Sequence, residues 1–253
     1  MNINNTLFIG KVVHNYNELP STNVYAQDLL SKSLPIEGTV ITTFNQTAGR
    51  GQIGSKWISE ADKNISLSII LYPHFLVPKE QFILHTVSSL AVSDLLTKYL
   101  EDAVKVKWPN DIYIKDRKTS GILTQNSIST TKINYSIIGI GLNVNQTDFP
   151  STIPNPTSLK LAAKRDFNLE TLVSELCLCV EHRYLQLKSG QQNSLKNNYL
   201  ERLYKLEEPA WYQRADGSKF YGTIKGVDSM GRLIIELNGH LEYFQIKEIS
   251  FLD

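Results

Sequence analysis

The first segment suited to chemistry is a glycine-bearing stretch at residues 46–54. Arg50 stands between Gly49 and Gly51, and Gln52 follows. Glycine lets a ligand approach the backbone closely, and free N–H groups beside an arginine suit an anion. Together with Gly54 the spacing matches a dinucleotide fingerprint, but no helix-opening sequence follows, so we reject that match. The stretch is either a phosphate-wrapping loop or a plain surface loop with an exposed arginine.

The second segment is Lys107-Trp108-Pro109-Asn110-Asp111. Proline removes a ladder donor, so this run cannot be the centre of a strand. It is either an ordinary turn or a turn in a functional site. In a functional site, Asp111 would bind a magnesium ion or accept hydrogen bonds, and Asn110 would be a polar contact.

The third and fourth segments combine glycines with polar side chains. Lys118 precedes Gly121 by three residues, and Gly139, Gly141 and Asn143 alternate along a later stretch. A glycine in a strand lets a ligand or another backbone lie close to the sheet. Two glycines two apart leave one strand face bare, so we expect an occupant above them. The alternatives are a solvated lysine and, for the glycines, a bulge or tight packing against a helix.

Several classes of function are excluded. The net charge of +1 over 253 residues provides no basic field for nucleic acid. The five histidines have no zinc-site spacing, and neither a G-x-S-x-G elbow nor a GxxxxGK[ST] loop is present, so we expect no metal site built by a protein cluster. No apolar run could span a membrane, and no signal peptide is visible. Cys177 and Cys179 are expected to be reduced thiols, which favours the cytoplasm.

The elements that must position these residues are runs of strands with a few long helices. Ser21, Thr22 and Asn23 offer cap side chains for a short helix, and Asn168 caps a long one. Hydrophobic periodicity predicts further helices at 78–99 and 194–204. Alternating or β-branched stretches predict strands at 7–14, 38–44, 65–71, 104–107, 111–115, 121–125 and 133–144. Hairpin signals such as Asn238-Gly239 predict four or five short strands after Pro209.

The predicted fold class is α+β. We expect one mixed, mainly antiparallel sheet with helices on one face, followed by a small β-barrel. Strands that come in runs argue against a doubly wound parallel sheet. We place a catalytic domain at residues 1–206 and the small module at 207–253. A module of this size needs to dock on the rest of the chain to be stable.

In order and spacing, these segments resemble the biotin protein ligases. The resemblance rests on polar, glycine and tryptophan positions between about residues 10 and 146: Ser21-Thr22-Asn23, Gln46, Gly49-Arg50-Gly51, Trp57, Lys107 to Asp111, Lys118, Gly121, and Gly139-x-Gly141-x-Asn143. The run from Lys107 to Asp111, followed seven residues later by Lys118, is the most specific part. The resemblance implies a class II synthetase-like catalytic domain and an SH3-like C-terminal barrel.

The resemblance also implies a two-step reaction. Biotin and MgATP give biotinyl-5′-AMP, which then acylates a lysine of a biotin carboxyl carrier protein. Arg50, Lys118 and Asp111 are expected to be catalytic, with Mg²⁺ near Asp111. The biotin contacts implied are Ser21, Thr22, Asn23, Gln46, Gly49, Arg50, Gly51, Gln52, Lys118, Gly121, Gly139 and Gly141. The ATP contacts implied are Arg50, Trp57, Lys107, Asn110, Asp111, Lys118 and Asn143.

The chain departs from the family pattern in two places, and three rival functions are alternatives to a biotin protein ligase. Some members carry arginine where Gln52 stands, and some use a basic side chain in the last strand, where this chain ends Phe251-Leu252-Asp253. A repressor is rejected, because the first catalytic strand is expected to begin near Leu7. A lipoate or octanoate ligase or transferase of the same fold is the nearer rival, and a biotin-binding module without enzyme activity is another. The oligomeric state stays open, with a homodimer as one option.

Overall fold

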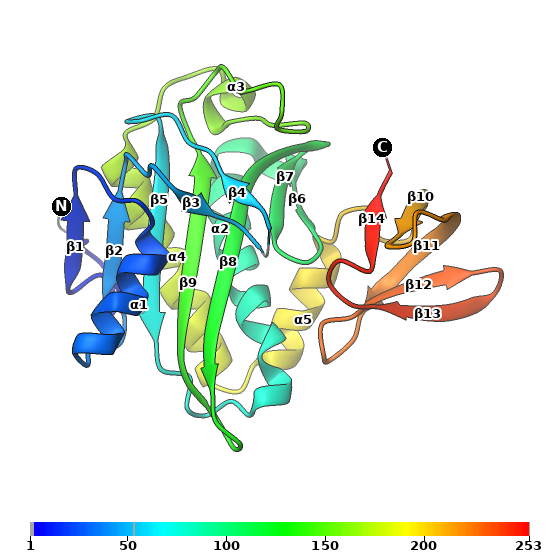
Figure 1. Ribbon diagram of the computed structural model, residues 1–253, viewed down its shortest axis with the longest axis horizontal. Coiled ribbons are helices and arrows are strands. Elements are labelled where there is room, and N and C mark those ends of the chain that lie inside the picture. Colours follow the sequence, from blue (N-terminus) through cyan, green and yellow to red (C-terminus); the bar gives the residue numbers. More distant parts are fainter. Residues whose placement is uncertain (1–2, 53, 253) are drawn as a thin grey trace.

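A seven-stranded sheet forms the centre of the computed structural model, which describes residues 3–52 and 54–252 (Figure 1). Its strands lie in the order β1-β2-β5-β9-β8-β7-β6. Their bounds are β1 Val13–Tyr16, β2 Val40–Thr43, β5 Asn64–Leu71, β6 Val104–Lys107, β7 Asp111–Ile114, β8 Arg117–Ile128 and β9 Ile133–Asn143. β1 and β2 are parallel and all the other neighbours are antiparallel, which confirms the predicted mixed, mainly antiparallel sheet.

The first strand begins later than predicted. The stretch 7–14 was expected to be a strand, but only its end belongs to β1. The backbone N–H groups of Leu7, Phe8 and Ile9 donate instead to the carboxylate of Glu181, at 2.6, 2.7 and 2.9 Å. A side chain more than 170 residues away therefore takes the donors that a strand would have offered to its neighbour.

Helices cover both faces of the sheet, although one face was expected. Ile65, Leu67 and Ile69 of β5 join the main core with helices α2 and α4, whereas Ile70 joins a second core with Ala26 of α1. In Figure 1, α1 accordingly lies in front of the sheet and α2 and α4 behind it. The helix bounds are α1 Thr22–Lys32, α2 Phe82–Leu100, α3 Leu159–Ala163, α4 Leu169–Lys188 and α5 Gln192–Glu201, with short 3-10 turns at Pro78–Glu80 and Glu101–Ala103.

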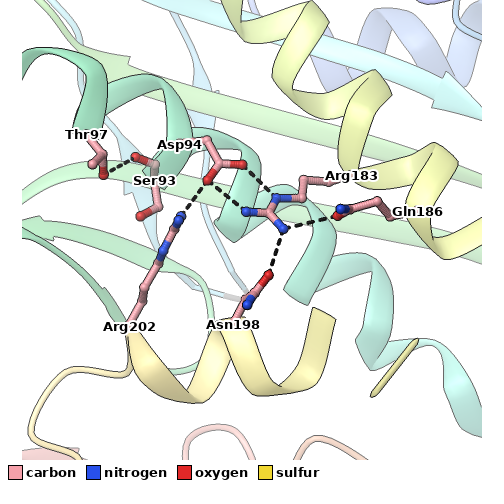
Figure 2. A network of polar contacts seen from close by, with 7 residues as sticks. All are labelled: Ser93, Asp94, Thr97, Arg183, Gln186, Asn198 and Arg202. Atoms are coloured by element: carbon pink, nitrogen blue, oxygen red, sulfur yellow. Dashed lines mark hydrogen bonds and ion pairs between the residues drawn. The ribbon is translucent and has the colours of Figure 1, made fainter. Parts of the chain in front are cut away.

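A polar network joins three helices behind the sheet (Figure 2). The carboxylate of Asp94 in α2 accepts two hydrogen bonds from Arg183 of α4, at 2.6 and 2.9 Å. It also accepts one from Arg202, just after α5, at 2.7 Å. Arg183 donates in addition to Gln186 and Asn198. The network fixes α5 against α2 and α4, and so fixes the chain that leaves α5.

The C-terminal part is a second, antiparallel sheet in the order β13-β12-β11-β10-β14, as the hairpin signals predicted. Its strands are β10 Pro209–Arg214, β11 Lys219–Val227, β12 Leu233–Leu237, β13 His240–Phe244 and β14 Ile249–Phe251. Asn238 and Gly239 both have positive φ, of 51° and 80°, as a two-residue hairpin turn requires. Within the described residues, no helix is long and apolar enough to cross a membrane.

The glycine-bearing stretch is more ordered than the expected loop. Strand β3, Gly49–Arg50, pairs with β4, Lys56–Trp57, in a two-stranded antiparallel ribbon. The N–H of Gly51 also donates to the Ser55 carbonyl at 3.0 Å. The ribbon lies on the α1 side of the sheet (Figure 1). Ile53, between Gln52 and Gly54 in the sequence, lies outside the described residues.

Candidate functional site

A cavity of about 200 Å³ lies between the start of α1, the β3–β4 ribbon and the strands β8 and β9. Most of the predicted site residues line it: Ser21, Thr22, Asn23, Gln46, Arg50, Gly51, Gln52, Trp57, Asn110, Asp111, Lys118, Gly121, Gly139 and Gly141. Seven lining residues were not predicted: Ser55, Lys56, Ser66, Pro109, Ile122, Leu123 and Ile140. The four sequence segments therefore meet at one place.

One end of the cavity is neutral, polar and tightly hydrogen-bonded. The Gln46 side-chain oxygen accepts the Thr22 backbone N–H at 2.9 Å, and so serves the first turn of α1. Ser21 occupies the N-cap position, but its side chain makes no cap hydrogen bond. A side chain from the neighbouring loop thus takes over the capping role expected of Ser21 and leaves its hydroxyl at the cavity wall.

Asn23 is held by two residues that the sequence did not indicate. Ser68 donates to its side-chain oxygen at 2.6 Å, and its amide nitrogen donates to Gln125 at 2.9 Å. Both partners come from strands of the central sheet. The sequence marked Ser68 only as a small polar residue that alternates with apolar residues in a predicted strand. These bonds fix Asn23 above the sheet, so its position is set before any ligand binds.

The other end of the cavity is charged. The Lys118 ammonium lies 2.6 Å from the Asp111 carboxylate, and both side chains are partly exposed. Arg50 and Lys56 also line the cavity. Together with Lys118 they give the cavity lining three cations against one carboxylate, that of Asp111, and so an excess of positive charge. Such an arrangement suits a polyanionic ligand.

A β-bulge brings Lys118 and Gly121 to the same side of the sheet. Residues three apart on a regular strand point to opposite faces. Here the pairing of β7 with β8 shifts at Ile112 and Tyr113, which adds one residue on β8. An added Cβ on Gly121 would accordingly lie 3.6 Å from the Lys118 side chain. The sequence contains no signal for this bulge, yet the cavity depends on it.

The strand face that Gly139 and Gly141 leave bare was expected to have an occupant above it. Side chains of the same protein lie there. A methyl group added at Gly139 would collide with Asn23, and one added at Gly141 would collide with the indole of Trp57. The same indole lies against Gly121. The Trp57 ring nitrogen is buried and has no hydrogen-bond partner among the described residues. A buried donor without an acceptor is uncommon, so this N–H is available to a ligand acceptor.

Three predicted residues do not line the cavity. Gly49 lies beneath Gln46 and Trp57. Asn143 is buried, donates to the Thr157 carbonyl at 3.0 Å, and has a side-chain oxygen without a partner among the described residues. Lys107 lies among aromatic rings outside the cavity, 4.8 Å from the centre of the Phe251 ring. No group of three or more potential metal ligands occurs among the described residues.

Comparisons with known proteins agree with this geometry. A model of the biotin/lipoate A/B protein ligase family matches residues 16–143. The bifunctional ligase/repressor BirA of Bacillus subtilis is 31% identical, over 92% of this chain and 72% of its own. The biotin–[acetyl-CoA-carboxylase] ligase of Mycobacterium tuberculosis is 27% identical, over 87% and 81%. The biotin protein ligase from Aquifex aeolicus, in complex with biotin and ATP, has a TM-score of 0.79 and 26% identity, covering 95% of this chain and 98% of its own.

Proposed function

Because this chain belongs to the biotin/lipoate A/B protein ligase family, we propose that it is a biotin–protein ligase. It uses MgATP to convert biotin to biotinyl-5′-AMP and then transfers the biotinyl group to a lysine of a biotin carboxyl carrier protein. The observation that carries this proposal is the single cavity with a neutral hydrogen-bonded end and a cationic end. Biotin pairs a mostly apolar bicycle and a polar urea with a carboxylate, and needs both kinds of surface.

The neutral end is the proposed biotin subsite. Ser21, Thr22 and Gln46 offer hydroxyl and amide groups to the ureido ring, and Asn23 borders it. Gly121, Gly139 and Gly141 keep side chains out of the way of the bicycle. The Trp57 indole lies against Gly121 and Gly141, so the biotin bicycle takes its place over these glycines and the indole packs against adenine. Adenine also offers an acceptor for the Trp57 N–H and a donor for the Asn143 side-chain oxygen.

The cationic end is the proposed adenylation subsite. The biotin carboxylate attacks the α-phosphorus of ATP, and pyrophosphate leaves. Arg50 and Lys118 neutralise the negative charge that crowds around this phosphorus, each contributing about 2–4 kcal/mol to transition-state stabilisation. Asn110 is a polar contact, and the Asp111 carboxylate would hold the Mg²⁺ that accompanies ATP, which would neutralise phosphate charge. One carboxylate beside substrate phosphates suits magnesium, which is commonly bound in this way.

The second step needs no nucleophile from the enzyme. The uncharged amine of the carrier lysine attacks the acyl carbon of biotinyl-5′-AMP, AMP leaves, and the amine proton passes to solvent. The β3–β4 ribbon, including Gly49, Gly51 and Gln52, covers the adenylate and limits its hydrolysis. Because Gln52 supplies no charge, Arg50 is the cation of the ribbon's first strand that retains the adenylate.

The carrier domain is the proposed macromolecular partner, and nucleic acid and membranes are not part of the proposal. We place the reaction in the cytoplasm, where the buried thiols Cys177 and Cys179 stay reduced. A homodimer is compatible with each of these assignments.

ATP–pyrophosphate exchange tests the proposal. Exchange should depend on biotin, and lipoate or octanoate at the same concentration should give no more than background. Exchange with lipoate but not with biotin would assign the chain to the other branch of its family. Biotin binding without any exchange would leave only a binding module.

A further inference from the structure

The turn 108–110 contacts the C-terminal sheet through Trp108. The indole N–H of Trp108 donates to the carbonyl of Gly231 at 2.9 Å, and Trp108 is buried. Gly231 has a φ of +87°, and an added Cβ there would collide with Phe82. The position therefore requires glycine, and the carbonyl that receives Trp108 is fixed by both its conformation and its packing.

Lys107, the residue before Trp108, contacts the same sheet through its last strand. Its ammonium lies 4.8 Å from the ring centres of Tyr113 and Phe251 and 6.0 Å from that of Tyr204. It donates to the Tyr113 hydroxyl at 3.0 Å. Rings around an ammonium attract it through their negative faces. We call Tyr113, Tyr204 and Phe251 the aromatic box.

Residues after α5 connect this region to the helix layer. The Arg202 carbonyl accepts the N–H of Val106 at 2.8 Å, and the Val106 carbonyl accepts that of Tyr204 at 2.9 Å. The chain after α5 thus pairs with the edge strand β6, directly before Lys107. Tyr199 of α5 also donates to the Pro109 carbonyl, at 3.3 Å. The ion network of Figure 2 fixes Arg202 itself.

We infer that Lys107 and Trp108 are positioning residues. They bind the turn 108–110 to the C-terminal sheet, and this attachment fixes the positions of Asn110 and Asp111. Neither Gly231 nor Phe251 lines the cavity. Through these two contacts the C-terminal sheet acts on the turn and not on the ligand. The inference rests on the proposed ligase function, and it gives Lys107 a role different from the ATP contact expected at first.

The consequence should be confined to one half-reaction. Asp111 lies at the charged end of the cavity, paired with Lys118, whereas Thr22, Asn23 and Gln46 hold the neutral end through bonds that do not involve the turn. Loosening the turn should therefore slow adenylation and leave biotin affinity unchanged. A displacement of about 1 Å in a catalytic group can lower a rate by about a hundredfold.

The first test compares Lys107→Met with Lys105→Met. Both lysines belong to β6, and Lys105 is exposed. Methionine keeps the aliphatic stem and removes the ammonium. We expect Lys107→Met to lower kcat for biotin-dependent exchange by about ten- to a hundredfold, with the Kd for biotin and the Tm near wild-type values. Lys105→Met should behave as wild type. A wild-type kcat in Lys107→Met would overturn the inference.

A double-mutant cycle with Phe251→Leu separates positioning from direct nucleotide binding. If the aromatic box holds Lys107, Phe251→Leu lowers kcat in the same way, and the double variant is no slower than Lys107→Met. If Lys107 instead binds nucleotide itself, the Lys107→Met loss is much larger than the Phe251→Leu loss, and the two losses multiply. This second pattern contradicts the inference.

Hydrogen exchange supplies a readout that needs no ligand. The Ile122 N–H donates to the Asn110 carbonyl at 3.1 Å and so reports on the turn. Its exchange should quicken in Lys107→Met and in Trp108→Phe, which keeps a ring but loses the bond to Gly231. Trp211→Phe, on an exposed position of the C-terminal sheet, is the matched control. Unchanged exchange in both turn variants would refute the positioning role.

The proposed function and this inference fail differently. A wild-type protein without biotin-dependent exchange refutes the ligase, whatever the turn does. An active wild type whose Lys107 and Trp108 variants keep a normal kcat refutes only the positioning role.

Discussion

Two clusters of aspartate and basic side chains lie on opposite faces of the sheet and differ in how many partners they have. In the cavity, Asp111 has Lys118 as its one ion-pair partner among the described residues, at 2.6 Å. Behind the sheet, Asp94 accepts three hydrogen bonds from Arg183 and Arg202, and Arg183 also donates to the side-chain oxygens of Gln186 and Asn198 (Figure 2).

The difference separates a cluster that can exchange partners from one that cannot. Lys118 can leave Asp111 for a phosphate, since only one contact breaks and another cation–anion contact replaces it. Arg183 would leave three partly buried acceptor side chains behind, and leaving such groups unpaired is unfavourable. The open pair therefore suits catalysis and the saturated network suits structure.

Replacing Lys118 with alanine should give the largest effect. The proposed contact to the reacting phosphate is lost, so biotin-dependent exchange should fall by about a thousandfold, while the Tm stays near that of wild type. Lys160→Ala is the matched control, because Lys160 pairs with Asp166 at 2.7 Å on the surface. A Lys118→Ala protein with near wild-type exchange would remove Lys118 from the mechanism.

Asp94→Asn should show the opposite behaviour. Breaking a network that is largely buried leaves Arg183 and Arg202 without their counter-charge, which should lower the free energy of unfolding by about 3 kcal/mol. Urea denaturation measures this loss, and well below the denaturation midpoint the activity per folded molecule should fall far less than in Lys118→Ala. Asp28→Asn, in an exposed pair with Lys32, should change the free energy by less than about 0.5 kcal/mol. Equal losses of unfolding free energy in Asp94→Asn and Asp28→Asn would mean that the network contributes no more than an exposed ion pair.

Arg202→Met should have a smaller effect than Asp94→Asn. It removes one of three hydrogen bonds to the carboxylate and keeps the two from Arg183, so we expect a loss of about 1 kcal/mol. The same urea experiment provides the value. A loss as large as that of Asp94→Asn would mean that Arg202, and not Arg183, is the main partner.

The smallest of these effects is the one that Asp94→Asn should have on the pH dependence of the free energy of unfolding. Burial acts to raise the pKa of the Asp94 carboxyl, but the hydrogen bonds and charges of Arg183 and Arg202 outweigh it and lower this pKa below its usual value. The stabilisation is therefore complete above the unfolded-state pKa of about 4 and is lost as the pH falls through the lower folded-state value. Asp94→Asn should flatten the stability curve below about pH 4. An unchanged slope there would contradict the lowered pKa.

Much of the candidate site could be predicted from the sequence because its residues cluster in short segments. Lys118, Asp111 and Arg50 were each marked by a neighbouring glycine or proline, and they meet in one cavity. The partners that fix the site could not be predicted in this way. Ser68 and Gln125 reach Asn23 from distant strands, and the bulge that turns Lys118 towards Gly121 has no sequence signal.

The fold shows the same division. Local patterns predicted most strands, the Asn168 cap of α4 and the Asn238-Gly239 hairpin. The start of β1 was misplaced because Glu181 binds the preceding N–H groups, a contact over a long sequence distance. The single-sided helix layer was wrong for α1, since periodicity shows which face of a helix is apolar but not which face of the sheet it covers.

Mass spectrometry of a carrier domain after incubation with biotin, MgATP and this protein shows whether the protein biotinylates its carrier. One lysine of the carrier should gain one biotinyl group, omitting ATP should prevent the gain, and Lys118→Ala should prevent it at matched enzyme concentration. An unmodified carrier in the presence of folded wild-type protein, biotin and MgATP would contradict the account.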